Sequence, residues 1–88
     1  MAEPGTHDYE SHLSMPAAGF IASLPRRQQQ KVLDLVEQIG RHPFQIGDYR
    51  MRDASGREVE NLLIEGFLFT YWVDHAAKEV RISEIIRL

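Results

Sequence analysis

The stretch that decides the fold is REVENLLIEGFLFTYWVDHAAKEVRISEIIRL, residues 57–88. Within it, Glu65-Gly66 is a two-residue connection in which the glycine supplies the positive φ that a tight hairpin requires. The runs on either side of this pair are apolar and rich in aromatic and β-branched residues, which is typical of strands. We therefore predict three consecutive antiparallel strands, each of which needs its neighbours to bury its apolar side chains.

Strict alternation assigns the side chains of the last two predicted strands to faces. In residues 67–73, Leu68, Thr70 and Trp72 are expected on one face, and on the other Phe67, Phe69, Tyr71 and Val73. A longer turn at residues 75–78 leads into residues 79–87, which alternate again. There one face is expected to carry Val80, Ile82 and Ile86, and the other Arg81, Ser83, Ile85 and Arg87. We expect the arginines to line the face opposite the core.

The first part of the chain predicts a short strand and a short helix. The strand is expected between Asp8 and Leu13, with Tyr9 contributing to the core. Pro16 suits the first turn of a helix, because its missing N–H has no partner there in any case. Ser14 or Met15 is expected to cap this helix.

A longer helix is predicted over about residues 25–40, because apolar residues recur there at helical spacing, namely Val32, Leu35, Val36 and Ile39. Gly40 is expected to end the helix in the left-handed conformation, and Pro43 prevents its continuation. Residues 49–52 predict an extra strand that pairs with residues 57–61 and sets Arg50 and Arg52 on one face beside Arg57.

These elements predict an α+β domain with a short N-terminal strand, a helical hairpin and an antiparallel meander of three to four strands. The 88 residues, 43% of them hydrophobic, are enough for one compact domain over residues 8–88 after a flexible segment 1–7.

The chain has no cysteine, and its four histidines lack a metal-ligand spacing, so we expect neither a metal nor another cofactor. No apolar run approaches the roughly 20 residues that cross a bilayer, so a cytoplasmic protein without membrane contact is expected. The formal charge of −3 argues against a bulk nucleic-acid binder.

Several segments resemble the RelE/ParE superfamily of toxins from bacterial type II toxin–antitoxin modules. They are FIASLPRRQQQKVLDLVEQIGRHPF (20–44), GDYR (47–50), the Gly66-Phe67 hairpin entering FTYWVDHAAKEVRI (69–82), and a final strand ending in Arg87. The resemblance runs from about Tyr9 to the end of the chain. It implies a role in a module of the plasmid-stabilisation type and a cognate antitoxin as partner. It also implies a target, which is messenger RNA on the ribosome for RelE-type members and DNA gyrase for ParE-type members.

The resemblance carries over few catalytic residues. Arg87 matches the arginine at the end of the last strand, and Arg50 matches a basic residue that contacts target. Leu68 stands where ribonuclease members have an arginine after the glycine-aromatic pair, and the strand before the hairpin reads Glu58-Val59-Glu60-Asn61 instead of supplying basic residues. Endoribonuclease activity is therefore an open question at the level of sequence, and a non-catalytic interaction module on the same scaffold is the alternative.

Two interpretations of the face opposite the helices follow from the residues themselves. In the first, the face binds a substrate: Arg57, Arg81 and Arg87 converge on a phosphate, Arg50 or Arg52 joins them, and Trp72 stacks on a base. In the second, these charges are solvated among Glu60 and Glu84, and a partner chain covers an apolar strip of Leu68, Trp72 and Ile85. The two interpretations are compatible, because an antitoxin can cover an active face. His75 is a candidate proton carrier or an inert turn residue.

Overall fold

The computed structural model describes residues 9–88, so the predicted flexible segment 1–7 lies outside the described residues. The elements in chain order are β1 (Glu10–Leu13), α1 (Met15–Ala22), α2 (Arg26–Gly40), β2 (Tyr49–Arg52), β3 (Glu58–Ile64), β4 (Phe67–Asp74) and β5 (Glu79–Arg87). The predicted α+β order is confirmed, including the extra strand at residues 49–52.

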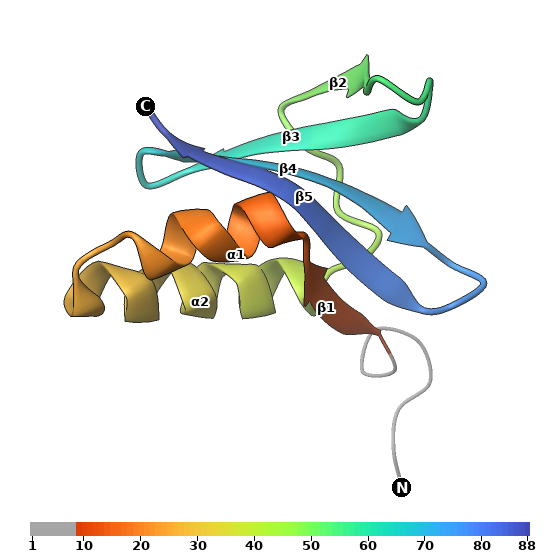
Figure 1. Ribbon diagram of the computed structural model, residues 1–88. Coiled ribbons are helices and arrows are strands. Elements are labelled where there is room, and N and C mark those ends of the chain that lie inside the picture. Colours follow the sequence, from red (N-terminus) through yellow and green to blue (C-terminus); the bar gives the residue numbers. More distant parts are fainter. Residues whose placement is uncertain (1–8) are drawn as a thin grey trace, which may run out of the picture.

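One five-stranded sheet holds all the strands, in the order β1-β5-β4-β3-β2. Strands β2 to β5 form an antiparallel meander, while β1 pairs with β5 in parallel. Both helices lie against the same face of this sheet, as the sequence predicts, and leave the opposite face without a helical cover (Figure 1). We call the uncovered side the open face.

The hairpin between β3 and β4 confirms the prediction from Glu65-Gly66. Both residues have positive φ, 52° for Glu65 and 86° for Gly66, which is the combination found in type I′ turns. The turn pairs Ile64 with Phe67 and so fixes the register of the two strands. Lys31 of α2 lies 2.5 Å from the Glu65 carboxylate and ties the hairpin to the helix.

The core lies between the helices and β3 to β5. The apolar stripe of α2 enters it through Val32, Leu35, Val36 and Ile39. These side chains share one buried cluster with the aromatic face of β4, which is formed by Phe67, Phe69 and Tyr71. The apolar stripe of the long helix and the aromatic residues of β4 therefore belong to one core.

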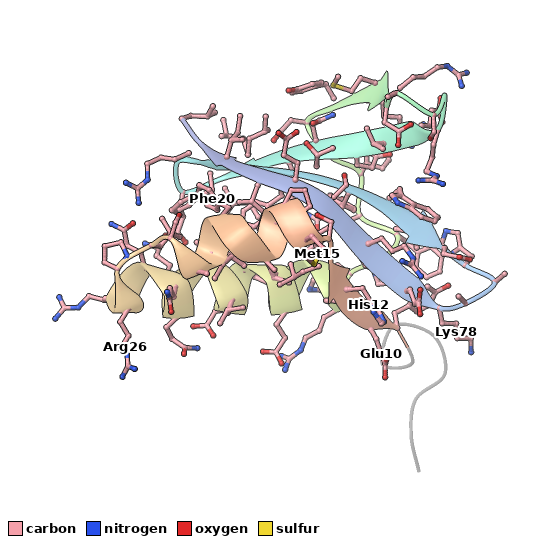
Figure 2. All side chains as sticks on the ribbon, in the orientation of Figure 1. Glu10, His12, Met15, Phe20, Arg26 and Lys78 are labelled. Atoms are coloured by element: carbon pink, nitrogen blue, oxygen red, sulfur yellow. The ribbon has the colours of Figure 1, made fainter. Side chains whose placement is uncertain are left out.

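Strand β1 is held by backbone and side-chain contacts to elements distant in sequence. The N–H of Glu10 donates to the carbonyl of Lys78 at 3.0 Å, and Figure 2 shows Glu10, His12 and Lys78 at the same end of the molecule. His12 Nε2 lies 3.4 Å from the Glu79 carboxylate. At the other end of β1, Ser14 caps α1 by accepting from the Ala17 N–H at 3.1 Å, and this confirms one of the two predicted caps.

The prediction that Gly40 adopts the left-handed conformation is wrong. Gly40 is the last residue of α2, and Arg41 closes the helix with φ −80°. A Cβ at Gly40 would overlap Ser11 Oγ, which donates to the Val36 carbonyl at 3.2 Å. Glycine stands at this position because β1 crosses the end of α2 closely, and not because the chain turns there.

Strict alternation in β5 is also wrong beyond Ile82. Thr70 pairs with Glu84 whereas Tyr71 pairs with Ile82, so Ser83 is an extra residue opposite β4. Such a bulge moves every later side chain to the opposite face. Ile85 is consequently buried in the core with 2% of its surface exposed, and Ile86 lies on the open face with 39% exposed.

Candidate functional site

The open face carries a cluster of one indole and two guanidinium groups. Trp72 and Arg81 form a cross-strand pair, with Arg81 Cζ 5.8 Å from the centroid of the Trp72 ring. Arg57, which precedes β3, places its Cζ 3.9 Å from the same ring. Distances below about 6 Å are those of cation–π contacts. The structure therefore brings together three of the predicted site residues.

The turn before β3 fixes Arg57. Asp53 Oδ1 accepts from the Ser55 hydroxyl at 2.6 Å, from the Ser55 N–H at 2.9 Å and from the Arg57 N–H at 3.0 Å. The pKa of Asp53 is lowered, chiefly by the Ser55 hydroxyl, so this carboxylate stays charged. It lies 3.7 Å from the Arg57 guanidinium, and Glu79 lies 2.6 Å from that of Arg81. Each guanidinium over Trp72 thus has a nearby carboxylate as well.

The prediction that Arg50 and Arg52 lie on the same face of the sheet as Arg57 is wrong. Arg50 pairs with Glu60 and Arg52 with Glu58, while Glu60 pairs in turn with Tyr71, a core residue. Paired side chains share a face, so Arg50 starts on the helical side of the sheet. Its Nε lies 2.6 Å from Glu60 Oε2, and this ion pair offsets its charge.

Arg50 and Arg57 nevertheless meet around the end of the sheet. They line one hollow of about 520 Å³ together with Trp72, Phe44 and His75. Phe44 stacks on His75 with centroids 5.2 Å apart, and Tyr9 Oη lies 2.8 Å from His75 Nδ1. His75 is therefore not isolated, since both Phe44 and Tyr9 contact its ring. Phe44 is a residue that sequence reasoning missed, because its partners come from distant segments.

Arg87 does not join the other arginines, and the predicted convergence of Arg57, Arg81 and Arg87 is wrong. Arg87 pairs with the core residue Phe67, and its Cζ lies 5.5 Å from the Phe67 ring. Its Nη2 donates to Gln28 Oε1 of α2. The bulge at Ser83 is the reason, since the extra residue moves every later side chain of β5 to the opposite face of the sheet.

Tyr71 is a core residue with a strongly held proton. Burial raises the pKa of its hydroxyl to about 12, with smaller contributions from the negative charges of Glu60 and Asp48. The hydroxyl donates to the Gln45 carbonyl at 3.3 Å. Tyr71 is consequently neutral at physiological pH and fastens the loop after α2 to the sheet.

A second hollow, of about 610 Å³, lies on the open face between β2 and β5. Leu68 and Ile86 contribute apolar walls, and Asn61 and Thr70 contribute polar groups. Asn61 is only 2% exposed. Its Oδ1 accepts from Thr70 Oγ1 at 2.8 Å, whereas its buried Nδ2 has no hydrogen-bond partner within residues 9–88. Sequence reasoning missed Asn61 as a site residue, although the period-two pattern already put it on the same face as Leu63.

Within residues 9–88, neither a metal-ligand group nor a membrane-spanning helix is found. No group of three or more histidine, aspartate and glutamate side chains there is arranged to hold a metal ion. No helix among the same residues has the length and apolar character needed to cross a membrane.

Comparison with known proteins finds likeness in structure and not in sequence. No protein-family model matches the chain, and no curated protein matches it. A chain of the toxin–antitoxin complex RelBE2 from Mycobacterium tuberculosis matches with a TM-score of 0.75 at 17% identity, over 92% of this chain and 99% of that chain. A chain of the archaeal RelE–RelB complex from Pyrococcus horikoshii OT3 matches with a TM-score of 0.66 at 13% identity, over 91% of this chain and 94% of that chain. The protein therefore has the fold of the RelE-type toxins found in RelBE toxin–antitoxin complexes.

Proposed function

We propose that this protein is the toxin, or a toxin-like component, of a type II toxin–antitoxin module, and that its antitoxin covers the open face. The observation that carries the proposal is the open face itself, which the helices of this RelE-like fold leave bare. The exposed apolar side chains there include Met51, Leu63 and Ile86, beside the Arg57–Trp72–Arg81 cluster. Both similar structures are toxin–antitoxin complexes, which supports a protein partner.

For the target, we favour the binding of a protein, such as gyrase or a component of the translation machinery, over cleavage of messenger RNA. Cleavage by attack of the RNA 2′-hydroxyl needs cations that converge on one phosphate. Arg87 lies on the other side of the sheet from Arg57 and Arg81, and Arg50 is paired with Glu60. The remaining cluster, two arginines on one indole, has Asp53 and Glu79 beside it, so its charge is partly offset and suits a protein surface better than a phosphate. A non-catalytic interaction module is the second candidate, and the same dispersal of the cations favours it.

Co-expression with the neighbouring small open reading frame, followed by affinity capture and a growth assay, tests the proposal. Ile86→Asp places a charge on the open face, and Leu33→Asp is a matched control on α2, because the two residues have 39% and 42% of their surface exposed. Capture and neutralisation are expected to fail for Ile86→Asp alone. Overexpression without effect on growth, together with no captured partner, would exclude the toxin role.

A second experiment separates the two kinds of target. Purified protein is added to ribosomes translating a reporter message, and cut sites are read by primer extension. We expect no codon-positioned cuts from the wild type. Robust cuts that Arg87→Ala reduces on the order of a hundredfold would establish Arg87 as a catalytic residue and overturn the preference for a protein target.

A further inference from the structure

Asn61, which lines the hollow on the open face, carries a hydrogen-bond donor that has no partner within residues 9–88. Asn61 lies on β3 between Tyr49 of β2 and Thr70 of β4, and all three residues line the hollow. Thr70 Oγ1 donates a hydrogen bond to the side-chain carbonyl oxygen of Asn61, so the amide nitrogen is the part of this side chain without a partner within residues 9–88. Buried polar groups in folded proteins nearly always have partners, so an unpartnered donor on a residue that lines a hollow indicates a ligand that accepts from it.

The walls of the hollow narrow the chemistry of that ligand. Leu68 and Ile86 favour an aliphatic group in its centre. Asp53 and Glu84 also line it, and two carboxylates disfavour a phosphate backbone. Just before β3, Arg57 lies over Trp72, and its guanidinium, 3.7 Å from Asp53, offers a cation for a carboxylate. A ligand with an uncharged hydrogen-bond acceptor, an aliphatic group and an acidic group has the chemistry of a polypeptide segment.

We propose that Asn61 is a specificity-determining residue whose Nδ2 donates to a carbonyl oxygen of a bound polypeptide segment. An aliphatic side chain of that segment fills the hollow beside Leu68 and Ile86, and an acidic side chain of it reaches Arg57. That the segment belongs to an antitoxin rests on the proposed function. The recognition itself rests only on the geometry of the hollow.

The first test uses a random peptide-display library selected on the full chain. Selected peptides are expected to share an aliphatic and an acidic position and to lose binding to Ile86→Asp but not to Leu33→Asp. Asn61→Ala is expected to weaken their binding about five- to tenfold, as the loss of one neutral hydrogen bond does. Its melting temperature is expected to fall only slightly, because the loss of the hydrogen bond from Thr70 Oγ1 is partly offset by the removal of an unpaired buried amide nitrogen. A residue with only a structural role would lower the melting temperature without weakening the binding of the selected peptides.

A spectroscopic readout avoids dependence on any variant that folds poorly. Asn61 is the only asparagine of the chain, so selective ¹⁵N-asparagine labelling yields a single side-chain amide pair in a heteronuclear NMR spectrum. Addition of a selected peptide is expected to shift this pair downfield and to slow its exchange with water. No selected peptide at all, or peptides that bind without moving the pair and bind Asn61→Ala equally well, would overturn the inference.

The two proposals fail in different ways. If the product of the neighbouring reading frame does not bind while peptides do so through Asn61, the toxin–antitoxin assignment fails and the recognition site stands. If that product binds the wild type and Asn61→Ala with equal affinity, the assignment stands and the role of Asn61 fails.

Discussion

Arg81 and Arg87 lie on opposite faces of β5, although an even number of positions separates them. Arg81 pairs with Trp72 on the open face, and Arg87 pairs with Phe67 on the side of the helices. The single extra residue Ser83 causes the difference. It also determines what the open face can do, because it removes a cation from that surface and replaces Ile85 there with Ile86.

Phe69→Ala is expected to cost about 3–5 kcal/mol of the free energy of unfolding, because the ring is fully buried between α2 and the sheet. Denaturant unfolding followed by circular dichroism measures the loss. Leu33→Ala, a truncation on the exposed side of α2, is the control and should change the free energy by less than about 0.5 kcal/mol. A melting temperature that moves by only a degree or two for Phe69→Ala would mean that the face of β4 is assigned wrongly.

Gly40→Ala is expected to destabilise the protein by about 1–3 kcal/mol, because the new methyl group overlaps Ser11 Oγ and overpacking of this size has that cost. Ser11→Gly in the same chain should recover part of the loss by clearing the space. The double-mutant cycle, measured by chemical denaturation, is expected to show coupling between the two positions. Additive effects would contradict a close approach of β1 to the end of α2.

Alkaline pH is expected to destabilise the protein through Tyr71. The pKa of its hydroxyl is about 12 in the folded protein, against about 10 in an unfolded chain. Between these values the unfolded state loses the proton first, so the free energy of unfolding falls as pH rises through this window. The contribution lost approaches roughly 2–3 kcal/mol. Urea unfolding of the wild type and Tyr71→Phe across this range measures it, and parallel curves for the two proteins would refute the effect.

Binding of a partner to the open face is expected to change the fluorescence of Trp72. It is the only tryptophan of the chain, so the emission reports on one position. Exclusion of water from the indole should shift the emission to shorter wavelength, and Trp72→Phe, which lacks the signal, corrects for the partner's own fluorescence. Tight binding by calorimetry with unchanged emission would place the partner on another surface.

The parts of the fold that local sequence rules govern could be predicted. Glu65-Gly66 gave the hairpin because few residue pairs accept two positive φ angles, and α2 followed from the spacing of its apolar stripe. The bulge could not be predicted, because Ser83 is compatible with both a regular and a bulged strand. Its place depends on how β5 meets β4 and on the Ser14 hydroxyl that donates to the Ser83 carbonyl at 2.7 Å.

The candidate site likewise contains residues that the sequence could place and residues that it could not. Trp72 and Arg81 were placed together by alternation before the bulge, and Arg87 was misplaced by the same rule after it. Asn61 and Phe44 could not be recognised from the sequence, since a buried orphan amide and a stacked loop aromatic exist only once distant segments pack.

The parallel pairing of β1 with β5 also sets an order of events during synthesis. The residues of β1 emerge from the ribosome early, yet their strand partner, residues 79–82, is made only after the helices and the rest of the meander. Until then the strand edge is unpaired, and such edges favour pairing with other chains. The brevity of β1 and its Glu10 and His12 reduce that risk, so the nascent chain carries its own protection against premature association.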